Sequence, residues 1–500
     1  MRKVLVANRG EIALRIIRAC HEEELEAVAV YSEADRTSPH VRAADTAVEL
    51  GPPPASESYL NIDRILKAAE RTGAEAVHPG YGFLAERAQF AQAVVDAGLI
   101  FIGPPAAAIA AMGDKTEARR RMSGAGVPVI PGTKELVETS EAAKAAAAEV
   151  GYPVLLKASA GGGGKGMRRA DSESEVDKLF SQASSEALSA FGDGSIYVEK
   201  LIERPRHVEV QILANRHGTT LHLGERECSV QRRHQKLIEE SPSPAVDTDL
   251  RTAMGEAAVQ AAESVGYVSA GTVEFLLDPS GYFYFLEMNT RLQVEHPITE
   301  LVYGVDIVRE QLRIAAGAPT SLEDVPRTPQ GHAIECRITA EDPFAGFLPA
   351  TGRVEYFQPP SGPGVRWDGG VDAGIEIGLF YDSLLGKLIT WGEDRQHAIR
   401  RMKRALDEMV IVGVHTSQPF HRRVMDDEHF ASGQYDIEYL EREGARTLEA
   451  RLDEDELKRM AVAVALAEDE RRKASIALPN NTRQTQESAW LLAARRAGLR

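Results

Sequence analysis

Cysteine is scarce and scattered in this chain of 500 residues. The three that occur, Cys20, Cys228 and Cys336, are odd in number and lie far apart, which excludes a disulfide framework and a zinc-binding motif. We expect reduced structural thiols in a cytoplasmic protein. Long apolar runs are missing too, since no stretch approaches the roughly 18 residues that a membrane-spanning helix needs. The first residues indicate a short strand and a turn, so we expect no cleavable leader.

Positive charge is also in short supply. Lysine and arginine total 58 against 75 acidic residues, which gives a formal net charge of -17. This balance argues against binding a nucleic-acid backbone over a broad surface, although local basic pockets for phosphate stay open. The chain is 43% hydrophobic and 27% charged, which is typical of a globular protein with several domains. We predict neither nucleic acid nor a membrane as a partner.

Polar and apolar residues alternate from residue 287 to residue 296, and this period of two is typical of a strand. Upstream, residues 271–277 and 282–286 are rich in β-branched and aromatic side chains, and residues 278–281 between them favour a turn. We therefore predict a β-hairpin around which the rest of the chain is organised.

The predicted hairpin brings acidic groups together. If its turn has two residues, Glu274 faces Phe285 and has Glu287 as its diagonal neighbour, roughly 7 to 8 Å away, and Asn289 follows on the same face. Such carboxylates repel one another unless a cation lies between them, and magnesium prefers oxygen ligands of this kind. The alternative is the solvated face of an amphipathic strand. The face continues with an anion-binding guanidinium, an amide and a candidate general base, Arg291, Gln293 and Glu295.

The first part of the chain, residues 1–113, alternates short apolar strands with amphipathic helices, which is the pattern of a parallel sheet. Its first turn contains a single glycine, Gly10, so the G-x-G-x-x-G fingerprint is absent and NAD binding is disfavoured. A tight loop at 78–84 is either functional or a plain turn. The expected elements are strands at 4–7, 27–31 and 74–77 and a helix at 11–24.

A glycine run marks the self-contained piece at residues 131–203. Residues 161–166, Gly-Gly-Gly-Gly-Lys-Gly, offer backbone amides that can wrap phosphate oxygens, and a disordered linker is the alternative. Because no Ser or Thr follows the lysine, this is not a Walker A loop. Lys157 follows an apolar run and would be costly to bury without an anionic partner, which indicates a phosphate ligand. The expected elements are strands at 152–158 and 195–201 and a helix at 172–191.

The remaining segments are β-rich and then helical. The charge cluster at 224–236 is typical of a solvated loop, and a basic amphipathic helix is expected at 397–410 within a β-rich part. A further helix is expected at 454–472, with apolar residues at i, i+3, i+4 and i+7. Such a stripe packs on its own domain or binds a partner. It consists of Leu457, Met460, Ala461 and Val464.

Several motifs together resemble a known family. They are 7–13, 78–84, 113–115, 232–236, 287–296 and 335–337, beside Lys157 and the glycine run. In this order they are similar to the ATP-grasp enzymes and, more closely, to the biotin carboxylase component of biotin-dependent carboxylases, over about residues 1–445.

The resemblance implies a multidomain α/β and α+β fold. A Rossmann-like N-terminal domain without a dinucleotide site would span 1–113, and an ATP-grasp domain would span 114–330, with a mobile lid at about 131–203. A β-rich C-terminal domain would follow at 331–443. The last part, 444–500, would be a helical extension.

The resemblance also implies a reaction. ATP phosphorylates bicarbonate to carboxyphosphate, which carboxylates the ureido nitrogen of biotin, with Mg²⁺ or Mn²⁺ as the metal. Glu295 would take the bicarbonate proton, and Arg337 would stabilise the biotin enolate. The catalytic set would be Lys236, Arg291, Glu295 and Arg337.

Binding roles follow from the same resemblance. ATP would contact Lys115, Lys157, Gly163, Gly164, Glu199, Lys200, Ile202, His207, Gln231, His234, Glu274, Leu276 and Glu287. The metal would be held by Glu274, Glu287 and Asn289. Bicarbonate would be bound by Lys236, Arg291, Gln293 and the Val294 backbone amide. Biotin would contact Tyr81 and Arg337.

Biotin is expected on a separate carrier protein. The carrier lysine of this class sits in a Met-Lys-Met turn, and none of the ten methionines flanks a lysine in that way. A carboxyltransferase subunit is the second expected partner, with docking at least in part through residues 444–500. A homo-oligomer is expected, but Pro363 stands where bacterial dimers often have an aromatic residue, so the dimer mode stays open.

The final acceptor is open as well. Acetyl-CoA is favoured, with propionyl-CoA, methylcrotonyl-CoA and pyruvate as alternatives, because another subunit selects it. A different ATP-grasp ligase would share the metal hairpin and glycine lid but gives no reason for Lys236 and Arg337. A silent nucleotide-binding scaffold would be favoured if Glu295 or Arg337 were replaced, and both are present.

Overall fold

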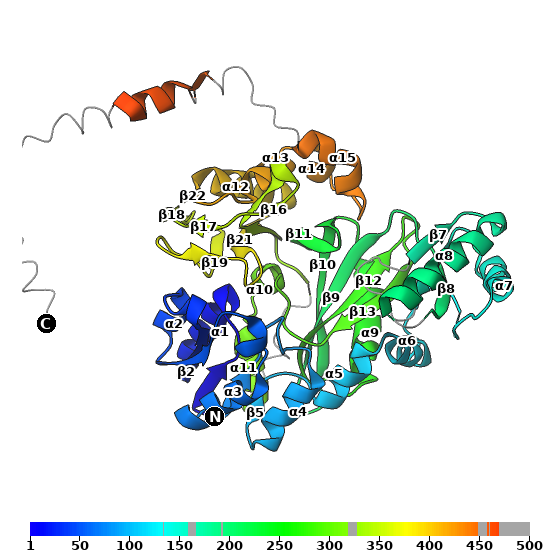
Figure 1. Ribbon diagram of the computed structural model, residues 1–500, viewed down its shortest axis with the longest axis horizontal. Coiled ribbons are helices and arrows are strands. Elements are labelled where there is room, and N and C mark those ends of the chain that lie inside the picture. The colour runs from blue at the N-terminus through cyan, green and yellow to red at the C-terminus, as the bar shows by residue number, and fades with distance from the viewer. Residues whose placement is uncertain are drawn as a thin grey trace, which may run out of the picture. The chain divides into compact units, whose positions relative to one another are not determined.

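The computed structural model describes residues 1–133, 135–158, 167–191, 194–318, 328–448, 458–459 and 461–469. The chain divides into two compact units, Met1–Leu448 and Glu449–Arg500. All labelled helices and strands belong to the first unit (Figure 1).

A parallel sheet of five strands, in the order β3-β2-β1-β4-β5, forms the N-terminal part. Its central strand is apolar on both sides, because helices cover both faces and two separate core clusters form there. The predicted parallel sheet is confirmed, with small shifts at the ends of its elements. The elements are β1 Lys3–Val6, α1 Gly10–Glu22, β2 Glu26–Ser32, α2 Pro39–Ala43, β3 Thr46–Gly51, α3 Ile62–Thr72, β4 Ala76–His78, α4 Ala88–Asp96, β5 Ile100–Phe101, α5 Ala106–Gly113 and α6 Lys115–Gly124.

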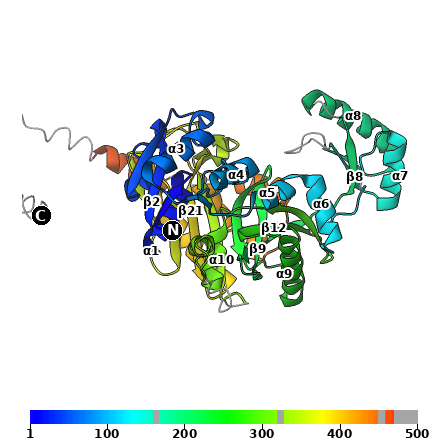
Figure 2. The ribbon, with the colours of Figure 1, turned by 90° about the horizontal axis from the view of Figure 1, so that it is seen from below.

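A three-stranded antiparallel sheet, β7-β6-β8, follows. Helices α7 and α8 pack together on it (Figure 2) and enclose a core of their own around Leu156 and Val198. The predicted strands and the long helix of this piece are confirmed, whereas the glycine run at 161–166 lies outside the described residues. The elements are α7 Ser140–Val150, β6 Val154–Ala158, β7 Met167–Ala170, α8 Glu173–Phe191 and β8 Ile196–Lys200.

The largest sheet has eight strands in the order β13-β12-β9-β10-β11-β14-β21-β19. It crosses the position predicted as a domain boundary near residue 330, because β11 pairs with β14 and sets Glu239 opposite Glu335. Strands from both sides of that position therefore share one sheet. The elements are β9 Arg206–Ala214, β10 Thr220–Arg232, β11 Gln235–Ser241, α9 Thr248–Glu263, β12 Ser269–Leu277, β13 Phe283–Asn289, α10 His296–Tyr303, α11 Ile307–Ala315, β14 His332–Thr339, β19 Val365–Gly369 and β21 Leu384–Gly392.

Short strand pairs and helices complete the first unit. The predicted basic helix is confirmed as α12, which packs on β21 and β14 around Met402. The remaining elements are β15 Glu341–Asp342, β16 Leu348–Pro349, β17 Gly352–Arg353, β18 Tyr356–Gln358, β20 Glu376–Ile377, α12 Arg395–Glu408, β22 Val410–Val412, α13 Gln418–Val424, α14 Glu428–Ala431 and α15 Tyr439–Leu448.

The central hairpin forms, but the predicted register is wrong. The Asp278 N–H donates to the Tyr282 carbonyl at 2.8 Å, so the turn is longer than two residues. An extra residue on β13 then makes a bulge. Glu274 consequently lies directly opposite Glu287 and not opposite Phe285.

The predicted strand at 287–296 is also wrong beyond Asn289, where β13 ends. Residues 290–295 form an irregular loop, and α10 begins at His296 with Pro297 in its first turn, where a missing N–H costs nothing. The loop, and not a continuing strand face, therefore carries Arg291, Gln293 and Glu295.

The charge cluster at 224–236 is not a solvated loop. It forms most of the hairpin β10–β11, whose two-residue turn has positive φ angles at Arg233 and His234, 50° and 66°. Arg226 and Glu227 are buried there, because other side chains neutralise their charges.

In the second unit, the predicted helix at 454–472 is helical where it is described, at 458–459 and 461–469. Ala461 and Val464 are exposed, and Leu457 and Met460 lie outside the described residues. In the part of the chain that the structure describes, no helix combines the length and the hydrophobicity that crossing a membrane requires.

Candidate active site

One cavity of about 1230 Å³ collects nearly all the predicted site residues. Glu295 is fully buried beneath it, and Gly163 and Gly164 lie outside the described residues. The predicted residues that line it are Tyr81, Lys115, Lys157, Glu199, Lys200, Ile202, His207, Gln231, His234, Lys236, Glu274, Leu276, Glu287, Asn289, Arg291, Gln293, Val294 and Arg337.

Glu295 lies between two cations. Its Oε1 accepts a hydrogen bond from Lys236 Nζ at 2.8 Å, and its Oε2 accepts one from Arg337 Nη2 at 2.9 Å. Burial opposes ionisation, but the two cations outweigh it and hold the pKa of Glu295 well below its ordinary value. The carboxylate is therefore ionised at neutral pH and is fixed in direction.

Lys236 binds three carboxylates at once. Besides Glu295, its Nζ donates to Glu209 at 2.6 Å and to Glu274 at 2.8 Å. Burial would lower the pKa of this lysine, but the surrounding acidic groups raise it well above its ordinary value. Lys236 thus remains a cation at the wall of the cavity.

The candidate metal ligands face one another across β12 and β13. Glu274 accepts hydrogen bonds from His207 at 2.8 Å and from the Asn289 amide at 2.8 Å. Glu287 opens onto the cavity, and its carboxylate makes no hydrogen bond with a described residue. Desolvation and the charge of Glu274 raise the pKa of Glu287. Two facing carboxylates, one of them unpaired, suit a divalent cation, which would relieve their repulsion.

Another group of close ligand atoms, from His207, Glu209 and Glu274, is not a convincing metal site. The Lys236 ammonium already bridges Glu209 and Glu274 and would repel a cation there. The exposed Glu287 is therefore the better anchor.

Ion pairs also form around Lys157, on the side of the cavity where a phosphate is predicted to bind. Glu199 accepts from Arg119 at 2.5 Å and from Lys157 at 2.9 Å, so Lys157 has an anionic partner, as its position after an apolar run requires. Lys200 instead donates to the carbonyls of Gly151 and Tyr152, at 2.9 and 2.8 Å.

Arg291 is held from outside its own loop. Its Nε donates to Glu86 at 2.8 Å, and its Nη1 donates to the Gln293 amide oxygen at 2.9 Å. Glu86 follows the 78–84 motif, which therefore supports this guanidinium from the N-terminal part.

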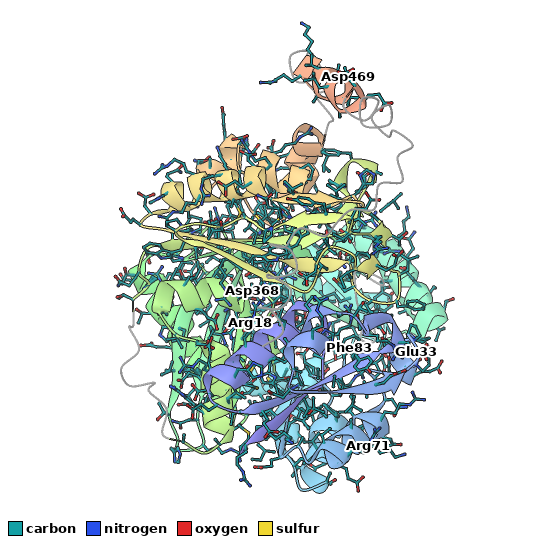
Figure 3. All side chains as sticks on the ribbon, turned by 90° about the vertical axis from the view of Figure 1, so that its left-hand side faces the viewer. Arg18, Glu33, Arg71, Phe83, Asp368 and Asp469 are labelled. Atoms are coloured by element: carbon teal, nitrogen blue, oxygen red, sulfur yellow. The ribbon has the colours of Figure 1, made fainter. Side chains whose placement is uncertain are left out.

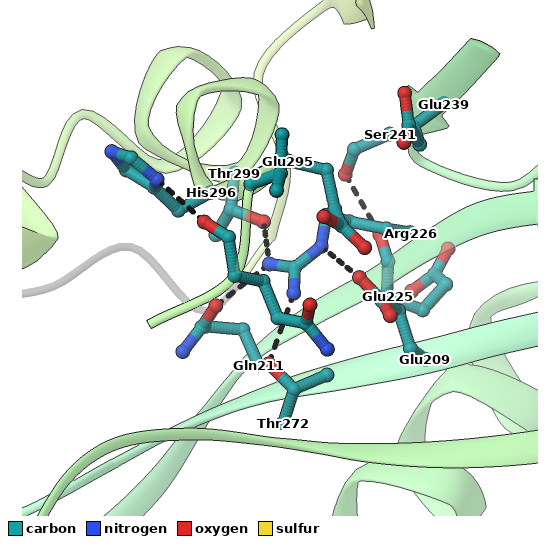
Figure 4. A network of polar contacts seen from close by, with 12 residues as sticks. Glu209, Gln211, Glu225, Arg226, Glu239, Ser241, Thr272, Glu295, His296 and Thr299 are labelled. Atoms are coloured by element: carbon teal, nitrogen blue, oxygen red, sulfur yellow. Dashed lines mark hydrogen bonds and ion pairs between the residues drawn. The ribbon is translucent and has the colours of Figure 1, made fainter. Parts of the chain in front are cut away.

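A fully buried arginine, Arg226, lies behind Lys236 and orients Glu209. Its Nε donates to Glu209 at 2.5 Å, and its other nitrogens donate to Gln211, Thr299 and Thr272. Figure 4 shows these groups converging on the Arg226 guanidinium. Glu209 is thus bound by a cation at each of its oxygens.

A second buried cation, Lys387, supports the loop at 290–295. Its Nζ donates to the Val294 carbonyl at 2.7 Å and lies 3.3 Å from the Glu11 carboxylate, which also accepts from the Tyr81 hydroxyl. Asp368, on the neighbouring strand, marks the junction between the C-terminal strands and the N-terminal part (Figure 3). Lys387 therefore links three segments of the chain at the cavity.

Comparison with known proteins identifies the family. Models of the biotin carboxylase N-terminal domain, of the carbamoyl-phosphate synthase L chain ATP-binding domain and of the biotin carboxylase C-terminal domain match residues 1–109, 114–323 and 335–442. The chain belongs to the biotin carboxylase family. Its ATP-grasp domain and its relatives make it an ATP-dependent ligase.

Proteins similar to this chain include a biotin carboxylase and subunits of two other carboxylases. A biotin carboxylase from Nostoc sp. is 54% identical over 439 residues, which cover 88% of this chain and 98% of the relative. A pyruvate carboxylase subunit from Methanothermobacter thermautotrophicus is also 54% identical, with 88% and 89% covered. The propionyl-CoA carboxylase alpha chain of Ruegeria pomeroyi is 46% identical over 507 residues, with 96% and 74% covered.

Solved structures agree with the fold. A biotin carboxylase complex with β,γ-ATP from Campylobacter jejuni has a TM-score of 0.82 at 48% identity, covering 88% of this chain and 98% of its own. The biotin carboxylase domain dimer of the Hydrogenobacter thermophilus 2-oxoglutarate carboxylase, with MgADP, ADP and bicarbonate, has a TM-score of 0.82 at 47% identity, covering 90% and 99%.

Sequence reasoning missed several residues at this biotin carboxylase site. The alternation at 207–212 puts Glu209 and Gln211 on the face of His207, and this signal could have found Glu209. Glu86, Arg226 and Lys387 gave no comparable signal, because their partners lie on segments distant in sequence.

Proposed function

We propose that this chain is the biotin carboxylase subunit of a biotin-dependent carboxylase. It would use ATP and bicarbonate to carboxylate biotin carried on a separate protein. The observation that best supports this proposal is the buried Glu295 carboxylate held between Lys236 and Arg337, beside a loop of anion-binding groups.

ATP would occupy the wall of the cavity formed by the lid and β9–β13. Lys115, Lys157 and His207 would contact the phosphates, and the other proposed nucleotide contacts that the structure describes line the same cavity. Mg²⁺ or Mn²⁺ held by Glu274, Glu287 and Asn289 would offset the charge that develops on the transferring phosphoryl group.

Bicarbonate would bind to Lys236, Arg291, Gln293 and the Val294 N–H. Its negative charge would lie close to Glu295 and would raise the proton affinity of that carboxylate, which is low in the free protein. Glu295 would then take the bicarbonate proton, and the freed oxygen would attack the γ-phosphate to give carboxyphosphate.

Biotin would enter beside Tyr81 and Arg337. Carboxyphosphate would break into carbon dioxide and phosphate, and that phosphate would remove the ureido proton. Arg337 would stabilise the enolate oxygen. Its Nε and Nη2 are committed to Glu239 and Glu295, which leaves Nη1 as the donor for this oxygen.

Partners follow from this chemistry. We propose a biotin carboxyl carrier protein, a carboxyltransferase subunit that docks in part through residues 444–500, and a homo-oligomer. We also propose a cytoplasmic location, which the three buried free thiols support.

For the final acceptor we propose acetyl-CoA, in a carboxylase of fatty acid biosynthesis. Propionyl-CoA is the second candidate, because the match to the propionyl-CoA carboxylase alpha chain covers more of this chain than the biotin carboxylases do and must extend past residue 442. Capture of the native partner with the full chain would decide between them.

The test is an assay of the purified chain. ATP cleavage should be slow, should require magnesium and bicarbonate, and should accelerate when free biotin is added. ATP turnover that does not depend on bicarbonate would contradict the proposal.

The proposed metal site has its own test. Glu287→Gln removes an anionic ligand and should raise the magnesium concentration needed for half-maximal rate. An unchanged magnesium requirement would contradict the proposed metal site.

A further inference from the structure

Arg337 is fixed from the side that faces away from the cavity. Its Nε donates to Glu239 Oε1 at 2.6 Å. Its backbone carbonyl accepts from the His421 ring at 2.6 Å and from the Ser417 hydroxyl at 3.0 Å. Ser417 and His421 therefore anchor the main chain of β14 at Arg337, and Glu239 on β11 sets the direction of the guanidinium.

A second carboxyl group, Glu335, lies beside this contact. It is opposite Glu239 in the β11–β14 register and two residues before Arg337 on the same strand face. Side chains opposite one another in antiparallel strands have Cβ atoms about 4.5–5.5 Å apart. Glu239 and Glu335 are both fully buried, so they share a small volume with little access for water.

Three oxygen atoms of this pair have no hydrogen bond within the described part of the chain. They are Oε2 of Glu239 and both oxygens of Glu335. Two ionised carboxylates in this position would repel each other and would leave these oxygens without donors, which is costly in a buried site. One proton on the pair removes the repulsion and supplies the missing donor.

The surrounding charges locate that proton. Glu239 has the direct Arg337 contact, which favours its ionised form. Glu335 has no such contact with a described residue. The charged groups that act on it are Arg337 on its own strand and, from other elements, Lys387, Glu239 and Glu295. Burial, opposed by Lys387, raises the pKa of Glu335 well above its ordinary value, and burial, opposed by Arg337, raises the pKa of Glu239 to about 7.

We propose that Glu335 is a protonated carboxylic acid that shares its hydrogen with Glu239, and that this acid pair aims Arg337 at biotin. Glu335 and Glu239 are positioning residues, because neither lines the cavity. The part concerning biotin rests on the proposed function, whereas the protonation state of Glu335 does not.

The experiment compares substitutions of Glu335 in the full chain. Glu335→Gln keeps the shape and an N–H donor, so biotin-stimulated ATP cleavage should stay within about twofold of the wild type. Glu335→Leu removes the donor and lets Glu239 and Arg337 shift, which should lower the biotin-stimulated rate by up to about a hundredfold. The bicarbonate-dependent rate without biotin should change much less.

Glu240→Gln is the matched control. Glu240 follows Glu239 on β11 and is about as buried as Glu335, but it belongs to a separate network with His332 and Arg395. The control should leave the ratio of the two rates unchanged even if it destabilises the fold. If the ratio of the two rates stays unchanged in Glu335→Leu, whether both rates fall equally or neither falls, the positioning role is overturned.

Infrared spectroscopy tests the proton directly. The difference spectrum of wild type minus Glu335→Gln should contain the C=O stretching band of a protonated carboxylic acid. A difference spectrum with carboxylate bands alone would overturn the acid pair, even if the enzyme carboxylates biotin. An inactive wild type that shows the acid band would instead reject the proposed function and leave the acid pair intact.

Discussion

Two adjacent glutamates on β11 have opposite electrostatic environments although both are fully buried. Glu240 accepts hydrogen bonds from His332 at 2.6 Å, from Arg395 at 2.7 Å and from the Tyr435 hydroxyl. Burial is outweighed there, and the pKa of Glu240 falls to about 2. Glu239 has Arg337 as its cation and shares it with Glu295, so burial raises its pKa to about 7.

The difference follows from what each sheet face does. The face of Glu240 serves only the packing of the C-terminal helices, so every charge can be fully paired. The face of Glu239 borders the cavity proposed for anionic reactants, and Arg337 must keep Nη1 as a donor for them. Acidic groups on this face, such as Glu239, therefore accept fewer hydrogen bonds than their oxygen atoms could accept.

The largest effect is expected when the Glu295 carboxylate, which binds both Lys236 and Arg337, is neutralised. Glu295→Gln removes the proposed base and should lower the bicarbonate-dependent and biotin-stimulated ATP cleavage rates by at least about a hundredfold. Both rates would be measured beside thermal unfolding, which separates lost chemistry from lost fold. Retention of either rate would contradict the role of Glu295 as the base.

Arg337→Ser should separate the two half-reactions. Without the guanidinium, the biotin enolate loses its stabilising donor, so biotin carboxylation should fall by about a hundredfold. Biotin-independent ATP cleavage should fall much less, because bicarbonate activation depends on Glu295 and Lys236. Equal residual activity in the two assays would show that Arg337 serves both steps.

On the opposite face, Glu240→Gln should affect stability and not catalysis. The pKa of Glu240 falls from 4.5 to about 2 on folding, so its ionised form contributes about 3 kcal/mol to the free energy of unfolding. This contribution is fully present above pH 4.5 and disappears as the pH falls toward 2. Chemical unfolding of both proteins should thus differ at neutral pH and converge in acid, and a constant difference would exclude this origin.

Local patterns predicted the parallel N-terminal sheet and the hairpin around Glu274 and Glu287. They failed where a non-local contact overrides the pattern. Alternation continues past Asn289 in the sequence, but the chain leaves the sheet there because Pro297 starts a helix and the Val294 carbonyl is held by a lysine far along the chain. The turn register failed because Asp278 bonds to backbone groups inside its own turn.

The motif resemblance predicted side chains that lie around one cavity in the structure. It did not predict the residues that hold those side chains in place. Arg226 lies in a stretch whose charges suggested a solvated loop, and the buried pairs that neutralise it come from strands paired only in the folded protein. Glu239 and Glu335 become neighbours through the β11–β14 register, which no local pattern encodes.

The smallest effect is expected from Lys387, the buried cation that donates to the loop at 290–295, called the bicarbonate loop because bicarbonate is proposed to bind there. Lys387→Met keeps the length and apolar character of the stem but removes the hydrogen bond to the Val294 carbonyl and the charge beside Glu11. A hydrogen bond from a charged group contributes about 1.5–3 kcal/mol, so a loosened loop should raise the KM for bicarbonate by roughly tenfold. The KM for ATP should stay unchanged, because the nucleotide contacts lie on other strands. Lys403→Met is the control, since that lysine pairs with Asp426 away from the cavity. If both KM values rise together, Lys387 supports the fold as a whole and not the bicarbonate loop.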